Sequence, residues 1–406
     1  NSTNALPKAK STDTHDFGEG SISGNILHLA IPMTLAQLIN VLYNIIDRIY
    51  IGHLPDMSTQ ALTGIGLTLP VITIITAFAN LFGMGGAPLF SMARGAGEPG
   101  RARKILGNSF SMLLISGGIL MILCYLFKRP LLYLFGASDI TYPYANAYIS
   151  LYLIGTLFVM ISLGMNNFIN AQGFGMTGML TVSIGAVLNL ILDPLFIFVL
   201  HMGVRGAALA TIISQGISAI WVLHFLTGKK AILTLSLAYM KLDFRLVKEI
   251  CALGLAGFIM AITNGSVQIV CNATLSRYGG DLYVGIMTVI NSVREIITMP
   301  VTGLTSGAQP VMSFNYGARR HARVKSAIKF TTIVCILFSC FMWALLLAFP
   351  RFFIHMFNSE PELLAEGVPA MHLYFFGIFM MSLQFAGQST NTALGRARQA
   401  VFFSLL

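Results

Sequence analysis

The chain has 406 residues, of which 55% are hydrophobic and only 10% are charged, and its mean hydropathy is +0.76. An ordinary soluble domain is roughly 25% charged, so this composition excludes a soluble enzyme, a nucleic-acid-binding protein and a disordered chain. The formal net charge of +10 is typical of basic loops in a membrane protein.

Long apolar segments alternate with short polar loops along the chain. About 20 apolar residues are needed to cross the roughly 30 Å hydrocarbon core of a bilayer. Such segments lie near residues 24–52, 62–91, 105–127, 144–169, 178–200, 206–227, 247–275, 283–314, 327–349 and 368–391, and an eleventh begins near residue 397. The sequence therefore predicts an all-α integral membrane protein.

Lysine and arginine residues are concentrated in alternate loops. If the amino terminus is cytoplasmic, 18 of them lie on the cytoplasmic side and 5 on the opposite side, and only Arg48 and Arg294 lie within spans. Basic residues favour cytoplasmic loops, so this distribution predicts a multi-pass protein with a cytoplasmic amino terminus. It also accounts for the net charge without a nucleic-acid partner.

The chain contains an internal repeat with an offset of 222 residues. This offset aligns Arg101 with Arg323 and Gly173 with Gly395, among other pairs from the first helix to the eleventh. Each copy has six helices, an even number, so the two lobes are predicted to be parallel repeats related by an axis along the membrane normal. The first copy ends near Gly228, so the second is expected to end near residue 450, which predicts twelve helices, about eleven of them in this sequence.

The repeat also predicts the organisation of the chain into four parts. These are a polar cytoplasmic tail (1–21), an N-lobe with helices one to six (22–228), a cytoplasmic linker (229–246) and a truncated C-lobe with helices seven to eleven (247–406).

Three acidic residues lie within the predicted spans, Asp47, Asp193 and Glu295. A carboxylate at the centre of a bilayer costs about 2.5–3.5 kcal/mol, so such residues indicate function. Glu295 directly follows Arg294, which favours local neutralisation or pairing instead. Asp47 aligns with Ile269 in the second repeat, so the acidic site is predicted to lie in one lobe only.

Each of the two aspartates has an alternative role in packing. Asp47 could extend toward the membrane surface with Arg48, and Asp193 could belong to a polar cluster that holds helices together. Asn189 lies one turn before Asp193 on the same helix face, and Thr211 on the sixth helix is a further candidate oxygen donor, although a helical threonine often bonds its own backbone.

Two further groups of polar residues point to a cavity. Asn40, Tyr43 and Asn44 share one helix face with Asp47, because they are spaced by three and four residues. The second group lies at the cytoplasmic half of the fourth helix and lines a cavity or caps the helix end. It consists of Asn166, Asn167 and Asn170.

These features resemble the multidrug and toxic compound extrusion (MATE) family, specifically its prokaryotic DinF-like branch. The resemblance extends from about residue 22 to residue 406. Its most specific segments are LAIPMTLAQLINVLYNIIDRIYIG, NLILDPLFIF and the repeat-related loops SMARGAGEPGRAR and SFNYGARRHAR.

The resemblance implies a twelve-helix fold of two six-helix lobes and a secondary transporter of the prokaryotic inner membrane, not an enzyme. It implies export of small organic, mostly cationic and lipophilic compounds in exchange for H⁺ or Na⁺, by a monomer in the lipid bilayer without a cofactor. It assigns the coupling ion, including Na⁺ where that is the ion, to Asp47, Asn189, Asp193 and Thr211, and a bend in the first helix to Pro32.

A flippase for lipid-linked oligosaccharides, or a polysaccharide exporter of similar fold, is the alternative function. Such a protein needs cationic groups in its cavity to bind a pyrophosphate, and here Arg48 and Arg294 each stand beside an acidic residue. Sequence signatures of enzymes, such as a zinc-binding H-E-x-x-H, are missing from the chain.

Overall fold

The computed structural model describes residues 17–52, 63–356 and 361–405, and this part of the chain contains no β-strand. Its α-helices are α1 (Ile22–Gly52), α3 (Leu69–Gly95), α4 (Pro99–Leu126), α5 (Lys128–Leu134), α6 (Tyr142–Ile154), α7 (Thr156–Ala171), α8 (Gly175–Pro194), α9 (Val204–Thr227), α10 (Phe244–Gly317), α11 (His321–Ala348), α12 (Pro350–His355), α13 (Pro361–Phe375), α14 (Ile378–Ala393) and α15 (Ala397–Leu405). A π-helix, η1 (Leu195–Val199), continues α8, and a short 3₁₀-helix, η2 (Leu237–Tyr239), precedes α10. The predicted all-α fold is confirmed.

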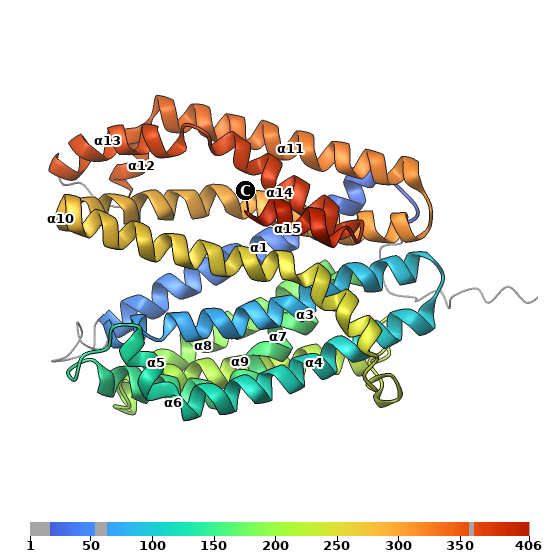
Figure 1. Ribbon diagram of the computed structural model, residues 1–406, viewed down its shortest axis with the longest axis horizontal. Coiled ribbons are helices and arrows are strands. Elements are labelled where there is room, and N and C mark those ends of the chain that lie inside the picture. The colour runs from blue at the N-terminus through green and yellow to red at the C-terminus, as the bar shows by residue number, and fades with distance from the viewer. Residues whose placement is uncertain (1–16, 53–62, 357–360, 406) are drawn as a thin grey trace, which may run out of the picture.

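Most of these helices have the length and apolarity of membrane spans. Within the described residues, seven helices can cross a bilayer, and nine can if each of two bent helix pairs counts as one span. The helix α10 is in fact two helices, because Gly280 has a φ of 63° and the chain reverses direction there (Figure 1). Its two halves correspond to the predicted spans 247–275 and 283–314.

Two predicted spans are bent in their middle. The pair α6 and α7 bends by 58° at Gly155, and the pair α13 and α14 bends by 42° near Gly377. The two glycines are 222 residues apart, so the bends occur at equivalent positions of the repeat. At Gly155 a Cβ atom would lie 2.8 Å from Cγ1 of Ile212, so glycine at this bend also permits the close approach of α9.

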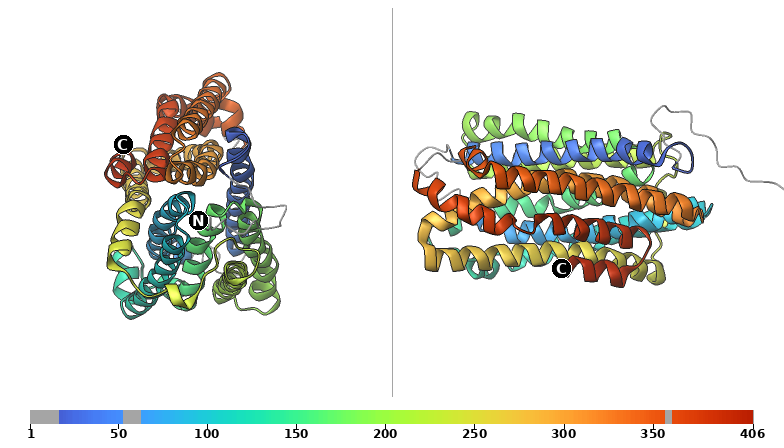
Figure 2. Two further views of the ribbon diagram at one scale, coloured as in Figure 1. Left: turned by 90° about the vertical axis from the view of Figure 1, so that its right-hand side faces the viewer. Right: turned by 90° about the horizontal axis from the view of Figure 1, so that it is seen from above.

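The helices form two groups, which we call the N-lobe (α1 and α3–α9) and the C-lobe (α10–α15). One hydrophobic core is built mainly from α3, α4, α6, α7 and α9. A second joins Phe17 and the beginning of α1 to α10, α11 and α14, and a third lies among α10–α14. The helix α1 and the first half of α10 run along opposite sides of the seam between the lobes (Figure 2, left). Each repeat therefore contributes its first helix to the seam.

The described contacts follow the repeat closely. Ser91 Oγ donates to the carbonyl oxygen of Ala171 at 3.5 Å, and Ser313 Oγ donates to that of Ala393 at 3.0 Å. Both members of the second pair are the residues of the first pair plus 222. The predicted internal repeat is therefore visible in side-chain contacts as well as in helix order.

Helices α3 and α10 meet at one end of the molecule, which we call the closed end. A Cβ atom on Gly95 would overlap the carbonyl oxygen of Phe314, and a Cβ atom on Gly317 would overlap that of Met92. Gly317 and Phe314 are the repeat equivalents of Gly95 and Met92. The closed end is thus sealed by a symmetric pair of backbone contacts that only glycine permits.

Candidate functional site

The two intramembrane aspartates meet inside the N-lobe. Asp47 comes from the carboxyl-terminal half of α1, and Asp193 comes from the last turn of α8, where Pro194 marks the change to the π-helix η1. Asp193 is 1% exposed, and its carboxyl group is close enough to that of Asp47 for the two to interact electrostatically. Oδ1 of Asp193 has no hydrogen-bond partner within the described part of the chain.

Asn189 and Thr211 complete this polar cluster, as their positions in the sequence suggested. Both side chains are buried, and the amide of Asn189 lies 3.2 Å from Oγ1 of Thr211. With its nitrogen facing Asp193, the amide donates to Oδ2 of Asp193 and accepts from the backbone N–H and the hydroxyl of Thr211. Thr211 Oγ1 also lies 3.0 Å from the carbonyl oxygen of Ala207, one turn earlier on α9.

Three tyrosines surround the carboxyl pair, and two of them were not predicted from the sequence. Tyr43 interacts electrostatically with Asp47 and Asp193, and it lines the same chamber as Thr211. Tyr148 and Tyr152, from α6, are both buried and stack with ring centroids 6.0 Å apart. Tyr152 aligns with Tyr374 in the repeat, and this alignment is the sequence signal that could have identified it.

A polar chamber of about 100 Å³ lies next to this cluster. Asn40, Tyr43, Asn189 and Thr211 form part of its wall. The remaining lining is rich in hydroxyl and amide groups and includes Ser162, Asn166, Thr181, Ser214, Gln215 and Ser218. The chamber is therefore lined by hydrogen-bonding groups from Asn189 and Thr211, beside the carboxyl pair, to Asn166.

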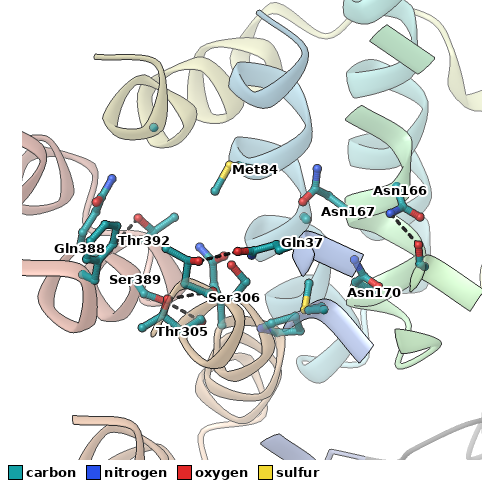
Figure 3. Close-up of a pocket in the computed structure, with 18 of the residues that line it drawn as sticks. Gln37, Met84, Asn166, Asn167, Asn170, Thr305, Ser306, Gln388, Ser389 and Thr392 are labelled. Carbon is teal, nitrogen blue, oxygen red and sulfur yellow. Dashed lines mark hydrogen bonds between the residues drawn. The ribbon is translucent and has the colours of Figure 1, made fainter. Parts of the chain in front are cut away.

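A larger cavity of about 470 Å³ lies between the two lobes. The predicted residues Asn166, Asn167 and Asn170 line it from α7, and Asn166 is shared with the polar chamber. Figure 3 shows these asparagines on one side and a group of hydroxyl and amide side chains of the C-lobe on the other. That second group was not predicted from the sequence and includes Thr305, Ser306, Gln388, Ser389 and Thr392.

The lining of this central cavity is polar but uncharged. No lysine, arginine, aspartate or glutamate is among its described lining residues, whereas Met33, Met84, Met179 and Met260 are. Gln37 bridges the lobes here, because its Oε1 accepts a hydrogen bond of 2.7 Å from Thr302. Methionine is flexible and polarisable, so such walls adapt to ligands of different shape.

Three further sequence predictions concern Asn44, Pro32 and Glu295. Asn44 belongs to α1, but its side chain lies outside the described part of the structure, and α1 continues as one helix through Pro32. Glu295 is exposed, and the described residues include no ion pair between it and Arg294. In the same part of the chain, no three His, Cys, Asp or Glu residues form a group that could hold a metal ion.

The sequence profile of the MatE family matches residues 32–195 and 257–406. The chain belongs to the MatE family. A multidrug export protein MepA of Staphylococcus haemolyticus is 28% identical over 395 residues, which cover 96% of this chain and 85% of that protein. A MepA of Staphylococcus aureus is 29% identical over 324 residues, covering 79% of this chain and 70% of that protein.

Solved structures of the same family share this fold. The MATE multidrug transporter DinF-BH, solved as a ligand complex, is 30% identical, with a TM-score of 0.88 and coverage of 98% of this chain and 88% of that one. An outward-facing multidrug resistance MATE transporter matches with a TM-score of 0.89 at 21% identity, covering 98% and 88%, and supports the fold alone. The predicted MATE family, DinF-like branch and fold are confirmed, and the protein is a secondary transporter of the membrane, not an enzyme.

Proposed function

We propose that this protein exports small organic, mostly cationic and lipophilic compounds in exchange for H⁺ or Na⁺, by alternating access. It is a MATE multidrug efflux transporter, in line with the MepA and DinF-BH relatives. The ion coupling rests on the interacting pair of Asp47 and buried Asp193. Their neighbours Asn189 and Thr211 line the polar chamber, which shares Asn166 with the central cavity.

The ion is bound because two adjacent carboxylates repel each other in a medium of low polarity. Two unit charges about 4 Å apart interact with roughly 4 kcal/mol at an effective dielectric constant of 20. A proton on one carboxyl group, or a Na⁺ between them, removes this repulsion. Na⁺ would find oxygen donors from Asp47, Asp193, the amide of Asn189 and the hydroxyl of Thr211, the ligand type that hard cations prefer.

Substrate binding is favoured when the carboxyl pair of Asp47 and Asp193 is ion-free and negatively charged. A central cavity of about 470 Å³ falls in the range of roughly 300–1,000 Å³ typical of sites for drug-sized ligands. When the carboxyl pair carries no ion, its negative charge attracts a cation in the neighbouring cavity through the chamber. When the pair is neutralised, this attraction is lost and the substrate leaves. Beyond the coupling ion, transport needs no cofactor.

The arrangement in the membrane follows the charge distribution. The closed end carries the basic loop with Arg319, Arg320 and Arg323, so it faces the cytoplasm of a prokaryotic cell, as does the amino terminus. The functional unit is a monomer in which residues 22–228 and 247–406 are the two moving lobes, joined by the linker 229–246. The polar tail before residue 22 lies on the same side.

A flippase for lipid-linked oligosaccharides is disfavoured by the cavity. A pyrophosphate needs arginine or lysine partners. The described residues that line the central cavity include neither, so the cavity suits a cation or a neutral molecule better than a polyanion.

Ethidium efflux from proteoliposomes tests the proposal. We expect Asp47→Asn and Asp193→Asn each to lower gradient-driven efflux at least about tenfold, because the amide neither binds a proton nor carries the charge that Na⁺ requires. Glu295→Gln is the matched control, since it makes the same change at an exposed acidic residue of a spanning helix. A pH gradient and a Na⁺ gradient are imposed separately, and the effective one identifies the ion.

Efflux at the wild-type rate in both aspartate variants would contradict the ion site. Absence of efflux in the wild-type protein under either gradient would favour the flippase function instead.

A further inference from the structure

The segment before α1 is held by the C-lobe although α1 begins the first repeat. The carbonyl oxygen of Phe17 accepts hydrogen bonds from Nδ2 of Asn315 at 2.9 Å and from Nη2 of Arg323 at 3.1 Å. Arg323 also donates to the carbonyl oxygens of Glu19 at 3.1 Å and Gly20 at 3.0 Å. We call residues 17–20 the amino-terminal clasp.

The ring of Phe17 joins this clasp to the N-lobe. Phe17 is 0% exposed and packs edge-to-face on Phe314 of α10, with ring centroids 5.8 Å apart. The guanidinium of Arg94, from the last turn of α3, lies 5.4 Å from the centroid of Phe17 and 5.1 Å from that of Phe314. Arg94 itself is held in the N-lobe, because its Nη1 donates to the carbonyl oxygen of Ala171 at 3.0 Å.

The other lobe shows a related contact at the equivalent position. Arg101, the repeat equivalent of Arg323, donates from Nη2 to Oε2 of Glu249 at 3.2 Å. Glu249 lies in the first turns of α10, so Arg101 holds the beginning of the second repeat's first helix and Arg323 holds the segment just before the first repeat's first helix. The contact of Arg101 is an exposed ion pair, which is weak in water, whereas that of Arg323 involves backbone carbonyls and a fully buried ring.

We propose that the amino-terminal clasp is a conformational latch that stabilises the closed end, and that it must separate from Arg94 each time this end opens. The inference rests on the proposed alternating-access function. Opening of the closed end moves α3 away from the second half of α10, because Gly95 and Gly317 lie in backbone contact there. Phe17 stays with Asn315 and Arg323 on one lobe while Arg94 stays with Ala171 on the other.

The latch has a clear physical basis. A guanidinium over aromatic faces in a buried position gains electrostatic attraction that it loses when the rings move away. The hydrogen bonds from Arg323 do not change on opening, because donor and acceptors move together. They keep the ring of Phe17 in place, so that Arg323 is a positioning residue and Phe17 is the part that touches the opposite lobe.

The rate of cysteine modification at the closed end tests this latch. The reporter is Met92→Cys, since the Met92 side chain packs against Gly395 across the closed end. The other native cysteines are replaced, and Cys124, which is buried in the N-lobe, is kept as an internal reporter of general loosening. The full chain in proteoliposomes is treated with a maleimide as the wild type and as the variants Phe17→Ala, Arg323→Gln and Arg319→Gln.

We expect Phe17→Ala and Arg323→Gln to raise the modification rate at position 92 by about fivefold or more, with Cys124 unchanged. Arg319→Gln is the matched control, because Arg319 is an exposed arginine of the same loop, and its rate should stay within about twofold of the wild type. An unchanged rate at position 92 in both clasp variants would overturn the proposal, as would an equal rise at Cys124. Modification reports opening directly, so this result is independent of whether the aspartate variants lose efflux.

Discussion

Replacement of Gly95 or Gly317 by alanine should force the two lobes apart at the closed end. In each case the added methyl group overlaps a backbone carbonyl oxygen of the opposite helix, that of Phe314 or that of Met92. Because both partners are backbone atoms, no change of rotamer relieves the overlap. The helices α3 and α10 must separate, and this separation is the movement that opens the end.

The size of the effect follows from the cost of overpacking. Insertion of a methyl group into a well-packed contact costs about 1–3 kcal/mol. If this cost is present only in the closed conformation, the ratio of closed to open molecules falls by about 5- to 150-fold. Because the two glycines are repeat equivalents in one seam, each variant should have a similar effect. The double variant should shift the equilibrium by less than the sum, since the first methyl group already separates the helices.

Distances between spin labels measure this shift. Lys104→Cys on α4 and Lys325→Cys on α11 place labels at two exposed lysines, one on each lobe near the closed end. Gly95→Ala and Gly317→Ala should enrich the longer distances. Gly100→Ala and Gly118→Ala are controls, because an added Cβ atom meets nothing within 4 Å at either position. Unchanged distances in both test variants, in folded protein, would refute the symmetric seam.

Two further substitutions test the polar contacts of the N-lobe. Thr211→Val should lower the free energy of unfolding by about 1–3 kcal/mol, because the buried amide of Asn189 loses the hydroxyl among its hydrogen-bond partners, and should reduce ion-driven efflux, whereas Thr211→Ser should retain both. Gln172→Ala should lower the unfolding temperature more than Gln384→Ala at a half-buried site, because the buried Gln172 amide bonds both the N–H and the carbonyl oxygen of Leu233 in the linker.

The helices could be predicted from the sequence, but their bends could not. A run of apolar residues reports that a segment enters a bilayer, because the cost of burying polar groups there is large. It contains no information on where the axis changes direction. The bends at Gly155 and near Gly377 depend on backbone conformation and on neighbours such as Ile212 that approach only in the folded chain. The reversal at Gly280, by contrast, lies between the predicted spans 247–275 and 283–314.

The candidate site was predictable where charge was involved and much less so where it was not. Asp47 and Asp193 stood out because an intramembrane carboxylate is costly. Thr305 did not, because a helical threonine commonly bonds its own helix, and here its hydroxyl does bond the carbonyl oxygen of Val301 while the residue lines the cavity. Tyr148 and Tyr152 were missed because tyrosine in a spanning helix usually indicates the membrane interface.

The structure combines a symmetric seal with an asymmetric pair of aspartates, the proposed ion site, and α1 connects the two. Near its beginning, α1 packs against the C-lobe at Gly307, where a Cβ atom would lie 2.9 Å from that of Ala30. Near its end it brings Asp47 to Asp193 on α8. The equivalent of Asp47 in the second repeat is Ile269, so the first half of α10 has the seam contact without the carboxylate. Under the proposed function, an ion therefore acts on only one of the two seam helices, and the symmetric contacts at the closed end transmit its effect to the whole molecule.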